Sequence, residues 1–346
     1  MPRKFYCSLT TLESLALYPE DMPELRALLT HHEVIMLDVP KAELEAQLDD
    51  PDSVLTSLLR IEAGNFVVDT QPGCQTDAEV LLRAEAAGAL FVLDHSPVKC
   101  EQLGRQFGVC AVSGTHGRPV STLTSYFFRQ LEKGTSYRTG TPPNAREGWP
   151  AVLAEEPLLP INAVVLIDNY LLKDEEIGKQ SAVSILDALL PPTLDAALPF
   201  QILLVVSVNG YPLKSKVLNR VIDYIEEKLK LSRKYPIEVG ILTHNGNEQF
   251  HRRVVISNYH FLHTDRGFTH FQAAKATKHN DITIKGAYHD LTRLNSHLAW
   301  RSMALDLRLV KNLLAENKAL RDAGREEVIQ TNLMRGACNN RLLDLV

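Results

Sequence analysis

The sequence lacks the features of a membrane-bound or secreted protein. It holds no unbroken apolar run of about eighteen residues, the length that a membrane-spanning helix needs. The opening residues, Met1-Pro2-Arg3-Lys4, lead into a mixed segment without an apolar core, so we expect no secretory signal. Five cysteines are scattered along the 346 residues and none forms a C-x-x-C pair, which predicts reduced thiols without a disulfide framework or a zinc site. These absences predict a cytoplasmic protein without a membrane partner.

Four common catalytic signatures are also missing. The chain contains no G-x-x-x-x-G-K-[ST], G-x-G-x-x-G, G-x-S-x-G or H-E-x-x-H segment. Interpretations as a P-loop ATPase, a dinucleotide-dependent dehydrogenase, a serine hydrolase or a zincin therefore have no support. Seven of the 12 histidines lie between His244 and His289, but their spacing matches no known pattern of metal ligands.

Charge is distributed unevenly between the two halves of the chain. Residues 1–150 carry 13 Lys and Arg against 20 Asp and Glu, whereas residues 151–346 carry 24 against 22. The net charge of −5 argues against a protein that coats nucleic acid along its whole surface. The second half can nevertheless accept a partner that carries phosphate groups.

Short apolar runs alternate with helical patterns along most of the chain, which is typical of the α/β class. Fully apolar strands between helices predict parallel sheets that are covered on both faces. The segment 133–160 contains five prolines and no regular period, so we interpret it as a linker. The predicted architecture is a first α/β domain over 1–132, a second over 161–285 and a helical extension over 286–346.

The helical extension carries leucines at spacings of three, four and seven residues. Leu298, Leu305, Leu309 and Leu313 belong to this series, which begins at Leu291. Such spacing places the leucines on one face of a helix. Two interpretations stay open: the helix packs on its own domain, or it binds a partner or a second copy of the chain.

The sharpest local feature is the segment that starts at His251. We expect a single strand over 252–262, on which side chains two residues apart point to the same face. His251 and Arg253 would then project together. An imidazole can attack a phosphodiester as a nucleophile, and a neighbouring cation can stabilise the charge on the phosphoryl oxygens. Arginine suits that second role because its guanidinium binds such oxygens in pairs.

Residues 161–271 resemble a phospholipase D-like domain, a superfamily that also contains nucleases. Its signature H-x-K-x4-D is matched here by His251-x-Arg253-x4-Asn258, and the stretch 264–268 stands where the family has a turn of small residues. The resemblance implies His251 as nucleophile and Arg253 as charge stabiliser. The family's lysine and aspartate are replaced by Arg253 and Asn258, and Asn258 cannot act as a carboxylate.

The family needs two such motifs in one active site, and this chain contains one. Three hypotheses follow from this difference. The protein is a phosphodiesterase or nuclease that is completed by homodimerisation, or a pseudo-enzyme that kept the fold for binding, or an unrelated α/β domain in which the motif arose by chance.

Residues 77–113 resemble the second half of a PIN-like domain, a nuclease fold that binds divalent metal through clustered carboxylates. The resemblance implies a Mg²⁺ or Mn²⁺ site formed by carboxylates at strand ends and a helix start. The candidate residues are Asp38, Asp69, Asp77 and Asp94, with Glu79 as a further possibility. The expected acid in the first strand is missing from residues 4–8. The alternative is that these carboxylates are solvated or cap helices and turns.

Both resemblances point to nuclease folds that have lost expected catalytic residues. Whether the chain is an enzyme is left open, and our leading hypothesis is a binding or scaffold subunit that needs no cofactor. Proteins that combine such domains resemble accessory components of prokaryotic antiviral defence or mobile-element systems. The expected partner is nucleic acid, a protein effector or a second copy of the chain. We expect phosphate contacts from Arg252, Lys214 and Lys216, because the two lysines stand at a strand end before a helix.

Overall fold

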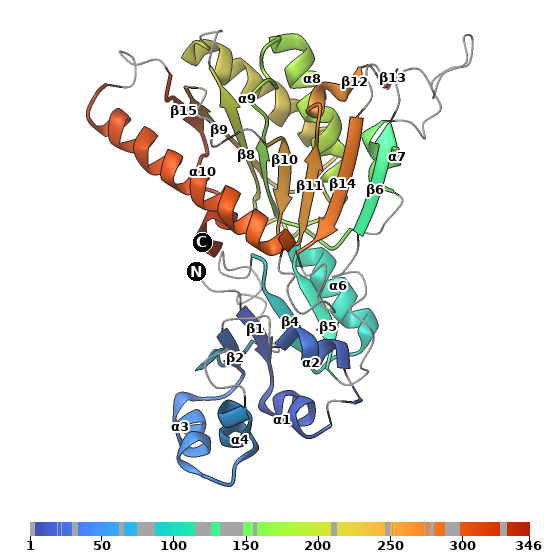
Figure 1. The fold of residues 1–346 in the computed structure, drawn as a ribbon, viewed down its shortest axis with the longest axis vertical. Helices are drawn as coiled ribbons and strands as arrows, with labels where there is room; N and C mark the ends of the chain where they lie inside the picture. The colour runs from blue at the N-terminus through green and yellow to red at the C-terminus, as the bar shows by residue number, and fades with distance from the viewer. Residues whose placement is uncertain are drawn as a thin grey trace.

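Figure 1 shows two α/β units stacked along the long axis of the molecule. The computed structural model describes residues 4–18, 20–21, 23–29, 34–61, 66–74, 87–114, 126–131, 148–154, 158–208, 213–245, 250, 252–272, 275–276, 280–287, 298–325 and 331–346. Three predicted site residues, His251, Asp77 and Glu79, lie outside these ranges. No described helix combines the length and the apolar character that crossing a membrane requires.

The first unit is built on a parallel five-stranded sheet, in agreement with the predicted class. Its strand order is β3 (Val67–Thr70), β2 (Val34–Leu37), β1 (Lys4–Cys7), β4 (Leu90–Leu93), β5 (Cys110–Ser113). The accompanying helices are α1 (Leu9–Leu17), α2 (Pro23–Leu29), α3 (Lys41–Asp49), α4 (Val54–Ile61) and α6 (Pro97–Phe107). Alternate strand residues are buried in two different apolar clusters, so helices cover both faces.

Helix α6 shows how local sequence signals fix an element. Ser96 caps its start by accepting a hydrogen bond from the Lys99 backbone N–H, and Pro97 occupies the first turn. Gly108 ends the helix with a φ of 64°, a left-handed conformation. A side chain at Gly108 would also meet the Ile161 carbonyl oxygen, 2.5 Å from the position of its Cβ. Residues next to each end of α6 therefore fix where this helix starts and stops.

The second unit is built on a mixed eight-stranded sheet. Its strand order is β15 (Met334–Gly336), β9 (Ile237–His244), β8 (Phe200–Ser207), β7 (Ala163–Ile167), β10 (Val254–Ser257), β11 (His260–Thr264), β14 (Asn280–Gly286), β6 (Tyr126–Leu131). Strands β7, β8 and β9 are parallel, and the remaining pairs are antiparallel. The single strand expected over 252–262 is wrong, because the chain turns at Asn258 and Tyr259 and forms an antiparallel hairpin.

Helices cover the two faces of this sheet differently. Helices α7 (Trp149–Leu153), α8 (Glu175–Leu189) and α9 (Ser215–Lys230) pack on one face, where Val164 and Leu166 point. Helix α10 (Leu298–Asp322) crosses the opposite face diagonally (Figure 1) and packs on Val165 and Ile167. The buried residues of α10 include Met303, Leu307, Val310 and Leu313, so this helix packs on its own unit. Leu305, which we expected on the buried face, is 52% exposed.

The chain segments that form the second unit differ from the expected boundaries. Strand β6 falls within the predicted first domain but pairs with β14 at one edge of the eight-stranded sheet. Trp149, in the predicted linker, is fully buried and packs on Phe268 and Phe271 at ring distances of 5.7 and 5.3 Å. Strand β15, in the predicted helical extension, adds to the opposite edge. The second unit thus draws on the chain from β6 to the C-terminus.

The two units meet at the edge of the eight-stranded sheet where β7 begins and β10 ends, which we call the proximal edge. The Tyr259 hydroxyl accepts a hydrogen bond from the Cys110 backbone N–H (2.7 Å) and donates to the Ala89 carbonyl (2.6 Å). A side chain of the second unit thereby joins the starts of β4 and β5 in the first. One apolar cluster also runs through both units, so the contact between them is a shared core.

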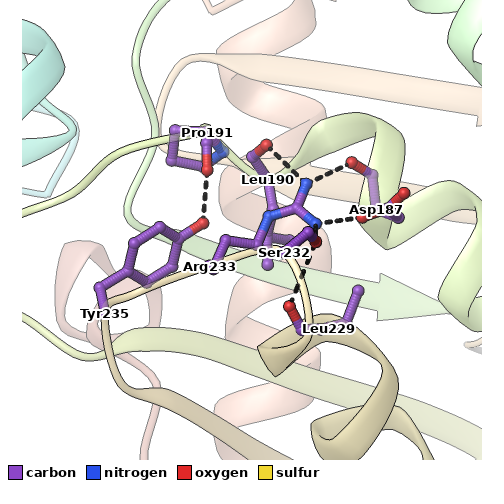
Figure 2. Close-up of polar contacts among 7 residues, drawn as sticks. All are labelled: Asp187, Leu190, Pro191, Leu229, Ser232, Arg233 and Tyr235. Carbon is purple, nitrogen blue, oxygen red and sulfur yellow. Dashed lines mark hydrogen bonds and ion pairs between the residues drawn. The ribbon is translucent and has the colours of Figure 1, made fainter.

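Arg233 binds the end of α8 beside the loop that follows α9, and Figure 2 shows its polar contacts. It follows α9, and its guanidinium donates to the carbonyl oxygens of Asp187 (2.7 Å) and Leu190 (3.2 Å) and pairs with the Asp187 carboxylate. The last carbonyls of a helix have no partner within it, so Arg233 supplies the missing donors for α8. The Tyr235 hydroxyl donates to the Pro191 carbonyl (2.6 Å) and fixes the chain that leaves this helix.

Candidate functional site

The distal edge of the eight-stranded sheet, opposite the first unit, collects most of the predicted binding residues. Strands β7, β8 and β9 end there because they are parallel, and β10 starts there because it is antiparallel to β7. Ligands of α/β proteins bind beside the carboxyl ends of parallel strands. The fold therefore brings Lys214 and Lys216, which follow β8, to the same edge as Arg252 and Arg253, which precede β10.

Asn258 lies at the other end of β10 and is separated from this edge. The four residues of β10 stand between Arg253 and Asn258, which corresponds to about 13 Å of extended chain. Asn258 is 1% exposed at the proximal edge, and its Oδ1 accepts hydrogen bonds from the backbone N–H groups of Asn162 (2.9 Å) and Ala163 (3.2 Å). Its Nδ2 donates to Asn162 Oδ1 (2.9 Å). The structure thus separates two of the three residues that the motif predicted to share a site.

Arg253 is held in place by the loops beside it. Its Nη1 donates to the Asp265 carbonyl (2.5 Å), and its guanidinium stacks on the Tyr170 ring at 5.2 Å. Its Nε lies 3.9 Å from Oδ1 of Asp168, the buried carboxylate that directly follows β7. Asp168 accepts hydrogen bonds from the backbone of Tyr170 (2.9 Å) and Phe268 (2.9 Å), so its position is fixed from two loops. Asp168 thus places a buried carboxylate beside Arg253, at a separation longer than a hydrogen bond.

Arg252 points to the α10 face of the sheet, where its side chain is 47% exposed. The register of β10 and β11 places Val254 opposite His263, next to this arginine. Burial lowers the pKa of His263; Asp265 raises it, while Arg252, Arg253 and Lys285 lower it further. His263 is therefore neutral at pH 7, and the positive charge here belongs to the arginines. The two arginines on opposite faces of one strand make the distal edge basic on both sides.

Lys214 and Lys216 extend this basic edge along the start of α9. Both side chains are exposed, and no acidic residue lies in the first turn of the helix. Arg335, just inside β15, donates to Ser215 Oγ (2.5 Å) and ties that strand to the same helix start. The partial positive charge of a helix N-terminus favours anions. We define the basic rim as Lys214, Lys216, Arg252 and Arg253.

Three of the predicted metal ligands, Asp38, Asp69 and Asp94, lie at the carboxyl edge of the first sheet, where each binds nearby groups of the protein. Asp38 Oδ1 accepts from the Gly73 N–H (2.5 Å), Asp69 Oδ1 from the Thr70 N–H (2.8 Å), and Asp94 Oδ1 from the Thr11 hydroxyl (2.9 Å). Across the described ranges, no three His, Cys, Asp or Glu side chains are grouped so that they could hold a metal ion. The observed contacts are those of turn-stabilising carboxylates, and the metal site stays a prediction.

A cavity of about 820 Å³ lies at the proximal side, between the two units. Its walls come from α6, β5, α7, the chain at 158–161 and the segment after α8 that Arg233 and Tyr235 fix. None of the predicted site residues that the structure describes lines it.

Asp306 is the residue near the rim that sequence reasoning missed. It lies on α10 with its side chain 6% exposed, and its Oδ2 stands 3.7 Å from Arg252 Nη1. Its spacing offered a signal, because Met303, Asp306, Val310 and Leu313 recur at threes and fours on one face of the helix. A single acid within an apolar stripe predicts a buried carboxylate that needs a cationic partner.

No model of a known protein family matches the chain, and no curated protein sequence matches it significantly. The phospholipase D-like and PIN-like resemblances therefore remain predictions from the motifs.

Proposed function

We propose that this protein is a non-catalytic subunit that binds nucleic acid through the basic rim. The observation that carries the proposal is the convergence of Lys214, Lys216, Arg252 and Arg253 on one edge of the eight-stranded sheet. They come from two connections that are 36 residues apart in the chain, between Lys216 and Arg252. Lysine and arginine side chains at such an edge contact the phosphate backbone, which supplies affinity without sequence specificity.

The positions of the motif residues favour binding over phosphodiester cleavage. Cleavage by the phospholipase D-like route needs a histidine, a cation and a third polar group around one phosphate. Asn258 instead makes its hydrogen bonds at the proximal edge, and the four residues of β10 separate it from Arg253. The cations of the rim can bind phosphate oxygens without any transfer step, which supports recognition of phosphate groups.

The charge distribution also favours approach of a polyanion to the distal edge. Residues 201–346 carry 22 Lys and Arg against 14 Asp and Glu, whereas the first 150 residues have a net charge of −7. The acidic unit lies at the opposite end of the molecule from the rim (Figure 1). Such a field orients an approaching polyanion toward the second unit. Within a prokaryotic defence or mobile-element assembly, the same subunit would hold nucleic acid for a catalytic partner.

Binding of labelled single-stranded and duplex DNA and RNA, measured by fluorescence anisotropy from about 50 to 200 mM salt, tests the proposal. We expect affinity to fall steeply with salt. A triple variant, Lys214→Glu, Lys216→Glu and Arg252→Glu, should lose most of the binding. The matched control is Lys41→Glu, Arg60→Glu and Lys99→Glu, which changes the net charge equally at exposed positions of the first unit. Equal losses in the two triple variants would contradict the proposed rim.

The same preparations test for turnover in EDTA and in Mn²⁺. We expect no cleavage in either buffer. Cleavage in EDTA that His251→Ala abolishes would establish the phospholipase D-like alternative. Cleavage that needs Mn²⁺ and survives His251→Ala would place a nuclease site at the carboxylates of the first unit.

A further inference from the structure

The ion pair between Arg252 and Asp306 is incomplete. Asp306 Oδ2 has no hydrogen-bond partner within the described part of the chain, although this atom is buried. Its distance of 3.7 Å from Arg252 Nη1 exceeds that of a charge-assisted hydrogen bond, about 2.7–2.9 Å. Arg252 is half exposed, so its guanidinium can turn toward solvent. The pair joins a buried acid to a half-exposed cation of the rim.

Burial removes the water that stabilises an ionised carboxylate, and a cation at this distance offsets only part of that cost in free energy. Burial raises the pKa of Asp306 to about 6, although the charge of Arg252 opposes this shift. The carboxylate is therefore ionised at pH 7.5 and largely protonated at pH 5.5. When it is protonated, Arg252 loses the negative charge that faces it.

Other ionisable groups surround α10, but their charges do not act on Asp306 as Arg252 does. The residues of α10 one turn away, Ser302, Met303, Leu309 and Val310, carry no charge. The ionisable groups on the elements packed against α10 are Glu238 and His244 of β9, Arg252 before β10, His260 and His263 of β11, Arg335 of β15, and Arg341 and Asp344 of the final turn.

We propose that Asp306 is a buried counter-charge that restrains Arg252, and that proton uptake by Asp306 releases Arg252 to bind a phosphate group of nucleic acid. This inference rests on the proposed function of the basic rim. The proton comes from solvent and is held on the Asp306 carboxyl group. Because linkage is reciprocal, a phosphate that captures Arg252 also favours protonation of Asp306. The rim is thus a polyanion site whose affinity rises as the pH falls.

The test compares the salt dependence of single-stranded DNA binding at pH 7.5 and pH 5.5. One additional phosphate contact steepens the slope of log K against log salt by about 0.7 for a single strand. For the wild type we expect this steepening at pH 5.5, with an affinity gain of about fivefold or more. For Asp306→Asn, we expect the steeper slope of log K against log salt, that of the wild type at pH 5.5, at both pH values. For Arg252→Gln, we expect the shallower slope, that of the wild type at pH 7.5, at both. Asp322→Asn, an exposed acid on the same helix, is the matched control and should respond like the wild type.

A second measurement follows the proton directly. Calorimetry at pH 6 in two buffers of different ionisation enthalpy reports the protons taken up on binding. We expect net uptake by the wild type and by Asp322→Asn, and a clear reduction in Arg252→Gln, which remains informative even if Asp306→Asn fails to fold. Wild-type and Asp306→Asn proteins with the same pH response would overturn the inference while leaving the rim intact. Absence of salt-dependent binding at either pH would overturn the proposed function itself.

Discussion

The two ends of strand β10 differ in how their polar groups are satisfied. At the proximal end, the side chains of Asn258 and Tyr259 each bind backbone groups through two hydrogen bonds. At the distal end, Arg252 faces one distant carboxylate oxygen. Saturated buried contacts define one arrangement, whereas an incompletely paired, half-exposed cation can change partners. The comparison teaches that one short strand connects a rigid contact between the units to an edge where Arg252 can change partners.

Replacing Asn258 with aspartate should have the largest effect on the proximal end of β10. Aspartate is also the residue that the phospholipase D-like family carries at this position, so the variant separates a structural role from a catalytic one. The new carboxylate would face Asn162 Oδ1 without a donor between them, in a site that is 1% exposed. The backbone N–H groups of Asn162 and Ala163 still donate to one carboxylate oxygen, but the other oxygen is left unpaired, and an incompletely paired buried charge costs about 3–5 kcal/mol. We expect Asn258→Asp to lower the free energy of unfolding in urea by about that amount and to confer no cleavage. Gain of nuclease activity with unchanged stability would contradict a purely structural role.

Removing the Tyr259 hydroxyl should have a smaller effect at the same end of β10. In Tyr259→Phe, the Ala89 carbonyl and the Cys110 N–H lose their shared partner between β4 and β5. Leaving buried backbone groups unpaired costs about 1–3 kcal/mol, so we expect a loss of about 2 kcal/mol in denaturant unfolding. Tyr170→Phe, at a 54% exposed tyrosine beside the rim, should change stability by less than about 0.5 kcal/mol. Similar losses of stability in Tyr259→Phe and Tyr170→Phe would contradict the proposed difference between the two ends of β10.

The sequence contains the local part of this structure. Ser96, Pro97 and Gly108 mark both ends of α6, and the apolar runs locate the parallel strands of each sheet. These signals are short-range, since caps and side-chain periods act within a few residues. The alternation of strands and helices therefore sufficed to predict the α/β class.

The long-range part was not accessible from the same patterns. Strand β6 pairs with β14 about 150 residues later, and nothing within residues 126–131 specifies that partner. The motif gives the spacing of Asn258 along the chain and therefore suggests a catalytic role. It does not indicate the turn after β10 that places Asn258 at the proximal edge. The sequence marks Lys214, Lys216 and Arg252 as candidate phosphate contacts, while their common edge follows from strand order. Predicting the buried position of Asp306 requires recognising that it is the one acidic residue on an otherwise apolar face of the helix.

The smallest stability effect is expected at the distal end and has the opposite sign. The pKa of Asp306 is about 6 in the folded protein, against an ordinary value of 3.8 that we take for the unfolded chain. Protonation of this group therefore stabilises the folded state, and the contribution is complete when the pH is below 3.8. That contribution is lost as the pH rises from about 4 through 6, and above this window the buried charge opposes folding. Asparagine stays neutral throughout. We therefore expect Asp306→Asn to raise the free energy of unfolding by about 1–2 kcal/mol at pH 7.5, and by progressively less toward pH 4. Unfolding curves in urea across this range measure the difference. A lower stability of Asp306→Asn at pH 7.5 would mean that the ionised carboxylate stabilises the fold through its pair with Arg252, and would contradict the expected cost of the buried charge.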